Sequence, residues 1–254
     1  MRLKDKVVVI TGAGRGLGKA FALTVASEGA KVVVNDINLE SAQTTAKEIQ
    51  DLGGQAVANS SDVSKWDEGK EIMETAVRTW GRIDVLVNNA AILKDRTLLK
   101  MTEEEWDSVV DICLKGTFIC SHFAAPYMRE QKWGRIINVT SASGLKGSFG
   151  QSNYAAAKAG IVGLTKTMAK ELGRYGVRVN CISPRAITAQ LMTPEVMKNL
   201  NINMGDKEAD SPTTAIGKIR APEAVAPLVV FLASDESEYM TGQIIGIDGG
   251  VAGL

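Results

Sequence analysis

Short apolar runs alternate along the chain with longer stretches of helical periodicity. The runs are apolar at consecutive positions, which is typical of strands buried on both faces of a parallel sheet. We predict strands at residues 6–11, 31–36, 55–60, 83–89, 135–140, 177–183 and 243–248. Apolar positions at helical spacing predict a helix over 39–52, and Thr102 followed by Glu105 predicts a capping box. The alternation predicts a doubly wound α/β fold with right-handed crossovers.

One segment interrupts this alternation. Residues 186–220 follow Pro184, include Met192, and carry a polar run that ends in SPTT. A connection of this length is typically a lid, a binding loop or a disordered insertion. We predict a single domain over residues 1–254, with a mobile substrate lid at about 186–220 in which Met192 faces the substrate.

The stretch TGAGRGLG follows the first predicted strand and opens a helix. Gly12, Gly16 and Gly18 permit a tight turn, close approach of the backbone to a pyrophosphate, and close packing of helix on strand. Free N–H groups at the helix N-terminus attract phosphates. The spacing is G-x-x-x-G-x-G, because Leu17 stands where the third glycine of G-x-G-x-x-G would fall. The turn predicts a dinucleotide site, with Arg15 and Leu17 as cofactor contacts beside the glycines.

Asp36 ends the second predicted strand, 36 − 18 = 18 residues beyond Gly18. A carboxylate there can accept hydrogen bonds from an adenosine ribose and repels a 2′-phosphate, so it favours NAD over NADP. The alternative is an ordinary turn carboxylate. Arg15 is the counter-signal, because a guanidinium can pair with a 2′-phosphate. Further cofactor contacts are expected from residues that follow the third and fourth strands: Asp62, Val63, Asn89 and Ala90.

The stretch NYAAAKAG sets Tyr154 four residues before Lys158, one helical turn apart. By spacing alone this is either an ordinary surface pair or a proton-transfer pair. The glycine turn, NNAA and Tyr154-x-x-x-Lys158, in this order, resemble the short-chain dehydrogenase/reductase (SDR) family over residues 6–250. The resemblance implies a Rossmann-type dinucleotide-binding and catalytic domain in a homodimer or homotetramer. It assigns catalysis to Ser141, Tyr154 and Lys158, and nicotinamide contacts to Pro184, Ile187 and Thr188.

The residue types suit the chemistry that the resemblance implies. A hydride moves between a carbinol carbon and the nicotinamide ring, and a proton must leave or join the oxygen. A free phenol is a weak acid, so Tyr154 needs nearby positive charge to act as a base at neutral pH. Lys158 and an oxidised nicotinamide supply that charge, and Lys158 can also bind the nicotinamide ribose. Ser141 is expected to hold the substrate oxygen.

Two positions depart from the family pattern. Cys113 stands where the family usually carries an asparagine that helps to hold a water of the proton relay. A thiol is a weak hydrogen-bond partner, so the relay uses backbone and water or runs slowly; a buried small hydrophobe is the simpler description of the packing. Arg185 stands where a glycine usually follows the proline, and it either binds a substrate carboxylate or phosphate or points to solvent.

Segments such as AILKDRT and GSFGQSNYAAAKAG resemble the hydroxyacyl-CoA dehydrogenase portion of peroxisomal multifunctional β-oxidation enzymes. TGQIIGIDGG resembles 3-oxoacyl-carrier-protein reductases instead. We therefore expect NAD-dependent interconversion of a 3-hydroxyacyl thioester and its 3-oxo form in fatty acid metabolism. Arg185 and Lys146 are candidates for contact with CoA phosphates or a second acyl carboxylate, and Ser143, close to Ser141, is a further candidate for substrate contact. The alternatives are a steroid, cyclic or aromatic alcohol dehydrogenase, and a non-catalytic cofactor-binding subunit of a hetero-oligomer.

Composition narrows the classes that remain. Lys plus Arg and Asp plus Glu both number 29, so no excess charge favours nucleic acid or an anionic membrane as a partner. The three cysteines are scattered without metal-ligand spacing, which suits a reducing compartment and predicts no metal site. The start MRLKDKVVVIT carries no signal-peptide core, and no unbroken apolar stretch approaches the length of a membrane span. We expect a cytoplasmic protein.

Overall fold

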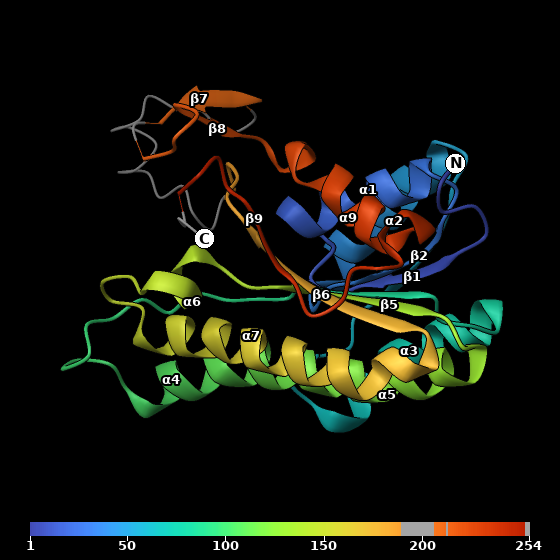
Figure 1. Cartoon of the computed structure of the whole chain (residues 1–254), viewed down its shortest axis with the longest axis horizontal. Helices are drawn as coiled ribbons and strands as arrows, with labels where there is room; N and C mark the ends of the chain where they lie inside the picture. The colour runs from blue at the N-terminus through green and yellow to red at the C-terminus, as the bar shows by residue number, and fades with distance from the viewer. Residues whose placement is uncertain (189–205, 212, 252–254) are drawn as a thin grey trace.

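The seven predicted strands form one parallel sheet in a computed structural model, which describes residues 1–188, 206–211 and 213–251 (Figure 1). The strand order is β3-β2-β1-β4-β5-β6-β9, and strand ends differ from the predicted ones by at most two residues. The strands are β1 (Val7–Ile10), β2 (Lys31–Asn35), β3 (Gln55–Asn59), β4 (Val85–Asn88), β5 (Gly134–Val139), β6 (Val177–Pro184) and β9 (Ile244–Ile247). The doubly wound α/β prediction is confirmed.

Helices cover both faces of this sheet (Figure 1). One layer holds α1 (Gly16–Ser27), α2 (Leu39–Asp51) and α9 (Ala226–Ala233). The other holds α3 (Trp66–Trp80), α4 (Glu103–Val110), α5 (Gly116–Gln131) and α7 (Ser152–Leu172). Short elements connect these helices and strands, among them α6 (Ala142–Lys146) and the 3₁₀ turns η2 (Gly173–Tyr175), η3 (Pro222–Ala224) and η4 (Asp235–Ser237).

The two layers explain why the strands read as continuous apolar runs. Side chains of a strand alternate between the two faces of a sheet. In β1, Val8 and Ile10 belong to the core with Phe21 of α1, whereas Val7 and Val9 belong to the opposite core, and all five are fully buried. A strand with only one buried face alternates apolar and polar residues. These strands are buried on both faces, so they are apolar at consecutive positions.

The order of the strands predicts a crevice at the carboxyl ends of the central strands. From β1 the chain moves outward to β2 and β3, and it then returns to β4 on the other side of β1. In a doubly wound sheet, ligands bind where the strand order reverses, outside the carboxyl ends of the strands. The connections that follow β1, β2, β4, β5 and β6 therefore determine the candidate site.

The capping box predicted at the start of α4 is confirmed, because Thr102 Oγ1 accepts from the Glu105 N–H and Glu105 accepts from the Thr102 N–H. The helix does not stop at Val110. It passes through a π-helical turn, η1 (Asp111–Lys115), into α5, a feature that the sequence analysis did not predict. Among the described residues, the run Glu103–Gln131 is the one helix whose length and mean hydropathy would suffice to cross a membrane. Its buried residues Cys120, Ala124 and Met128 pack in the core against the sheet.

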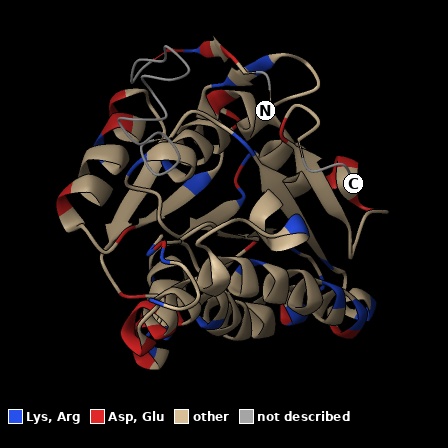
Figure 2. Ribbon diagram, turned by 90° about the vertical axis from the view of Figure 1, so that its left-hand side faces the viewer, with Lys and Arg blue, Asp and Glu red and all other residues tan. Residues whose placement is uncertain are grey.

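The predicted lid at 186–220 lies partly outside the described residues, and Met192 is among those that the structure does not describe. Its described part contains the antiparallel pair β7 (Glu208–Asp210) and β8 (Lys218–Arg220). Figure 1 shows this pair at the edge of the molecule, away from the seven-stranded sheet. Figure 2 shows Lys and Arg residues interspersed with Asp and Glu residues in both helical layers.

Candidate active site

A cavity of about 850 Å³ lies at the carboxyl ends of β1, β2, β4, β5 and β6. Its lining contains every residue that the sequence analysis assigned to cofactor binding or catalysis: Gly12, Arg15, Gly16, Leu17, Gly18, Asp36, Asp62, Val63, Asn89, Ala90, Ser141, Tyr154, Lys158, Pro184, Ile187 and Thr188. Segments up to 176 residues apart in the sequence (188 − 12) thus meet in one concave space. Their roles in binding and catalysis stay predictions.

The glycine turn leaves room for a ligand beside the backbone. Gly12 and Gly16 have φ values of +62° and +55°, a region that side chains other than glycine rarely adopt. A Cβ on Gly18 would lie 2.1 Å from the Gly12 carbonyl oxygen, so only glycine fits where α1 crosses the turn. Arg15 precedes α1 in an extended conformation without a side-chain cap. The first N–H groups of α1 therefore remain for an anionic group.

Asp36 follows β2 and is held by two backbone groups. One carboxylate oxygen accepts from the Gly14 N–H at 3.0 Å, and the other accepts from the Asn38 N–H at 3.0 Å. A carboxylate oxygen can accept more than one hydrogen bond, so Asp36 keeps capacity for the hydroxyls of a ribose. The contact with Gly14 also ties Asp36 to the glycine turn, so a dinucleotide fits these residues at both its phosphates and its ribose.

Thr11 connects the glycine turn to the segment that follows β4, and the sequence analysis did not single it out. Its Oγ1 accepts from the N–H groups of Asn89 and Ala90, both at 3.1 Å. The Asn89 amide in turn donates to the carbonyls of Thr11 and Gly12, both at 3.0 Å. The signal available in the sequence was a threonine at the end of an otherwise apolar strand.

Lys158 is a buried cation, with 1% of its surface exposed. Its Nζ donates to the Val139 carbonyl at 2.7 Å and lies 5.6 Å from the centre of the Tyr154 ring. An ammonium has three donors, so this contact leaves capacity for a ligand in the cavity. The backbone of Lys158 is also fixed, because Thr140 Oγ1 donates to its carbonyl at 2.7 Å. β5 and α7 thus hold the ammonium beside the phenol.

Ser141 lies at the end of β5 and caps the short helix α6. Its Oγ accepts from the Ser143 N–H at 3.2 Å. A hydroxyl that accepts one hydrogen bond keeps its own proton, so Ser141 can donate to an oxygen of a ligand. Serine hydroxyl, phenol and ammonium line the same cavity, as general acid–base chemistry on a carbonyl or carbinol oxygen requires.

Cys113 is fully buried within the π-helical turn and does not line the cavity. It packs with Val109 and Ala157, and its Sγ lies 3.8 Å from the Ile92 carbonyl. The packing is that of a small hydrophobic residue, as the simpler of the two interpretations expected. A π-helical turn within an α-helix is often found at a functional site. Here the turn brings Ile112 to the cavity wall.

The described candidates for substrate contact lie outside the cavity lining, and the side chain of each donates a hydrogen bond to another residue of the chain. Ser143 Oγ donates to Gln151 Oε1 at 2.8 Å, and Lys146 Nζ donates to the Val251 carbonyl at 2.8 Å. Arg185 donates to Thr213 Oγ1 at 2.9 Å through its terminal nitrogen, while its Nε is buried without a partner in the described part of the chain. Contact of these residues with substrate stays a prediction.

Several lining residues were missed because no motif marks them. Ile92, Leu93 and Ile112 form an apolar part of the wall, and Lys19 and Glu48 form an ion pair between α1 and α2.

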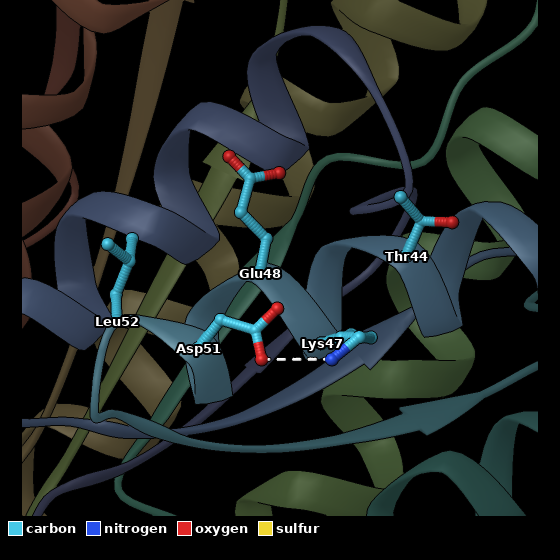
Figure 3. A pocket seen from close by; sticks show the side chains of 5 residues that line it. All are labelled: Thr44, Lys47, Glu48, Asp51 and Leu52. Atoms are coloured by element: carbon cyan, nitrogen blue, oxygen red, sulfur yellow. Dashed lines mark hydrogen bonds and ion pairs between the residues drawn. The ribbon is translucent and has the colours of Figure 1, made fainter.

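A second hollow of about 420 Å³ lies on α2, lined by Thr44, Lys47, Glu48, Asp51 and Leu52 (Figure 3). The dashed line there marks the Lys47–Asp51 ion pair, whose two residues lie one helical turn apart and are exposed, as in an ordinary surface pair.

The family model described as short chain dehydrogenase matches residues 6–200. The chain therefore belongs to the short chain dehydrogenase family, and the resemblance inferred from the motifs is confirmed. It is an oxidoreductase acting on CH–OH groups, in a fold that binds a nicotinamide cofactor.

The chain is similar over its length to several characterised relatives. A 3-oxoacyl-(acyl-carrier-protein) reductase FabG of Thermotoga maritima is 45% identical over 251 residues, covering 99% of both chains. The peroxisomal hydratase-dehydrogenase-epimerase of Saccharomyces cerevisiae is 44% identical, covering 100% of this chain and 27% of that protein. A crystal structure of a short chain dehydrogenase from Mycobacterium avium has a TM-score of 0.82 at 42% identity, covering 98% of this chain and 84% of that one.

Proposed function

We propose that this protein interconverts a 3-oxoacyl thioester and the corresponding 3-hydroxyacyl thioester with NAD(H). The observation that carries the proposal is that Ser141, Tyr154 and Lys158 line the same cavity as Asp36 and the glycine turn. Relatives named for 3-oxoacyl reduction and for a peroxisomal dehydrogenase support the thioester class. The name of the first relative specifies an acyl-carrier-protein thioester and that of the second specifies no carrier, so both CoA and acyl carrier protein are included in the assay below.

In the reducing direction, a bound nicotinamide nucleotide supplies the hydride for the 3-oxo carbon. Ser141 donates a hydrogen bond to the 3-oxo oxygen and stabilises the negative charge that develops there. The Tyr154 hydroxyl gives its proton to that oxygen, which completes the alcohol and leaves a phenolate. The buried Lys158 ammonium stabilises the phenolate through its positive charge. In the oxidising direction, the phenolate takes the proton back.

Asp36 supports NAD rather than NADP as the cofactor. Its carboxylate lines the cavity at the end of β2 and is fixed by the Gly14 and Asn38 N–H groups. A 2′-phosphate on the ribose would add a second negative group beside it. Arg15 lines the same cavity and is the one guanidinium in the described lining that could offset this repulsion.

An assay of nucleotide oxidation tests the proposal. NADH and NADPH are each paired with acetoacetyl-CoA, a 3-oxoacyl carrier protein thioester, and a cyclic ketone. We expect the highest kcat/KM for NADH with a thioester, and the two thioester arms identify the carrier. Turnover of the cyclic ketone alone would overturn the thioester class. A preference for NADPH would overturn the cofactor assignment, and no turnover with any activated ketone would favour a non-catalytic subunit.

A further inference from the structure

Asn153 is completely buried in the first turn of α7, directly before Tyr154. Its side-chain Nδ2 donates to the carbonyls of Lys94 at 3.0 Å and Glu105 at 2.8 Å. Its Oδ1 accepts from the Tyr154 N–H at 2.7 Å. The N–H groups in the first turn of a helix have no partner within the helix, so Oδ1 satisfies a donor that α7 itself leaves open. Asn153 thus joins three separate segments.

Of its two carbonyl partners, one adjoins the wall of the cavity and the other lies in α4. Lys94 follows Leu93, which lines the cavity in the connection between β4 and α4. Glu105 belongs to α4, and its carboxylate accepts from the Thr102 N–H and from the Arg96 guanidinium. The capping box and the Arg96 contact hold the start of α4 in place, so the Asn153 amide attaches α7 to an ordered segment.

Two further hydrogen bonds join the connection between β4 and α4 to the residues just before α7. The Arg96 N–H donates to the Gly150 carbonyl at 2.7 Å, and Gln151 Nε2 donates to Asp95 Oδ2 at 2.9 Å. Of these ties, the one made by Asn153 is the most buried and the nearest in sequence to Tyr154. It is also the one that bonds to the Tyr154 backbone itself.

We propose that Asn153 is a positioning residue that fixes the Tyr154 phenol against the cavity wall formed by the connection between β4 and α4. The proposal rests on the proposed function, in which Tyr154 transfers the proton. Lys158 holds the same helix to β5 through the Val139 carbonyl, so α7 is held both one residue before and four residues after Tyr154. A displacement of about 1 Å in a reacting group can reduce a rate roughly a hundredfold, so the tie matters for turnover.

Two substitutions distinguish the hydrogen bond that Asn153 accepts from the two that it donates. Asn153→Ala removes all three hydrogen bonds. Asn153→Asp keeps an oxygen for the Tyr154 N–H, but a carboxylate cannot donate to the carbonyls of Lys94 and Glu105. We expect both variants to lower kcat by roughly tenfold to a hundredfold, with nucleotide affinity changed less than about twofold. Wild-type kcat in either variant would overturn the proposal.

Asn180 offers a matched control for a general loss of stability. It is 2% exposed in β6, its Nδ2 donates to the Met240 carbonyl at 2.9 Å, and its Oδ1 accepts from the Gln243 N–H at 3.1 Å. It does not line the cavity. We expect Asn180→Ala to lower the Tm while kcat stays within about twofold of wild type, since no reacting group moves. Equal losses of kcat in Asn153→Ala and Asn180→Ala would overturn the positioning role.

Combination with Tyr154→Phe shows whether Asn153 acts through the phenol. In that background we expect Asn153→Ala to lower the residual rate no further, because two residues that act as a unit are not additive. A further drop of the same size as in wild type would contradict the proposal. If Tyr154→Phe is itself fully active, the proposed function fails instead, so the two failures are distinguishable.

Hydrogen exchange at the Tyr154 amide provides a readout without turnover. Asn153→Ala removes the acceptor of this N–H, so we expect its exchange to accelerate at least about tenfold, a loss of roughly 1.4 kcal/mol of protection. Asn153→Asp and Asn180→Ala should leave it near the wild-type rate. Unchanged exchange in Asn153→Ala would overturn the proposed contact.

Discussion

At the scale of single residues, Tyr154 and Lys158 are held in place by contacts with different parts of the protein. The Lys158 ammonium is buried and bonded to the Val139 carbonyl, which sets it 5.6 Å from the centre of the phenol ring. The Tyr154 backbone N–H donates to the Asn153 side chain, which in turn donates to the Lys94 and Glu105 carbonyls. The helical spacing alone places the two side chains on one face; these contacts determine where that face lies in the cavity.

Asp36 gives a prediction at the same scale. Asp36→Asn keeps a side-chain oxygen for the Gly14 N–H but removes the charge that repels a 2′-phosphate. We expect the ratio of kcat/KM for NADPH to that for NADH to rise at least about tenfold, which corresponds to about 1.4 kcal/mol. The measurement is steady-state kinetics with both nucleotides. Asp51→Asn, on α2 outside the large cavity, is the matched control, and an unchanged ratio in Asp36→Asn would contradict the role of the carboxylate.

At the scale of elements, the glycines of α1 and α7 provide a contrast. A Cβ on Gly18 would meet the Gly12 carbonyl oxygen at 2.1 Å, whereas a Cβ on Gly163 of α7 would meet nothing within 4 Å. We expect Gly18→Ala to abolish or sharply weaken nucleotide binding. We expect Gly163→Ala to raise stability by about 0.5–1 kcal/mol, because alanine is the better helix former. Nucleotide titration and thermal unfolding measure the two effects, and wild-type affinity in Gly18→Ala would contradict the account of the turn.

The elements also show what the sequence could predict. Burial on both faces makes each strand of the parallel sheet a continuous apolar run, and the capping box at Thr102 is a local pattern, so both were readable. The π-helical turn at Asp111–Lys115 was not, because no local pattern marks it. The partners of Asn153 were not either, because Lys94 and Glu105 lie 59 and 48 residues away in the sequence.

The site residues divide in the same way. Gly18, Asp36 and Tyr154 were found through spacing relative to a strand end or a helix, and all three line the cavity. Arg185 was singled out because it replaces the glycine that usually follows the proline, and its contact with substrate, like that of Lys146, was inferred from its charge. Where a long side chain lies depends on partners from distant segments, here Thr213 and the Val251 carbonyl, and spacing carries no information about those.

At the scale of the whole molecule, the sheet divides the interior into two cores and encloses the thiols. Burial raises the pKa of the Cys120 thiol to about 12 and that of the Cys181 thiol to about 11, and Cys113 is fully buried as well. The thiolate is the reactive form of cysteine. At pH 8 we expect the native protein to react with a disulfide reagent far more slowly than protein unfolded in guanidinium. Rapid release of one equivalent from the native protein would contradict this burial.

The same thiols predict how stability depends on pH. Their folded-state pKa values of about 12 and about 11 lie above the ordinary value of 9.0, so the unfolded chain releases these protons first as pH rises. Their contribution to stability is complete below pH 9.0 and is lost progressively as pH rises through the folded-state values. Urea titrations between pH 8 and pH 10.5 should show a falling free energy of unfolding, with a shallower slope in Cys120→Ala. An equal slope in that variant would contradict the assignment to Cys120.

In the function that we propose, one cavity combines a nucleotide site with a phenol that transfers a proton. Tyr154→Phe tests it most directly, because it removes a single hydroxyl and keeps the ring that packs near Cys113 and Ala157. The measurement is the rate of NADH oxidation with a 3-oxoacyl thioester, together with a fluorescence titration of NADH binding on the same preparation. We predict that turnover falls at least about a hundredfold while the Kd for NADH stays within about twofold, as expected for loss of a general acid. Wild-type turnover in Tyr154→Phe would contradict the account.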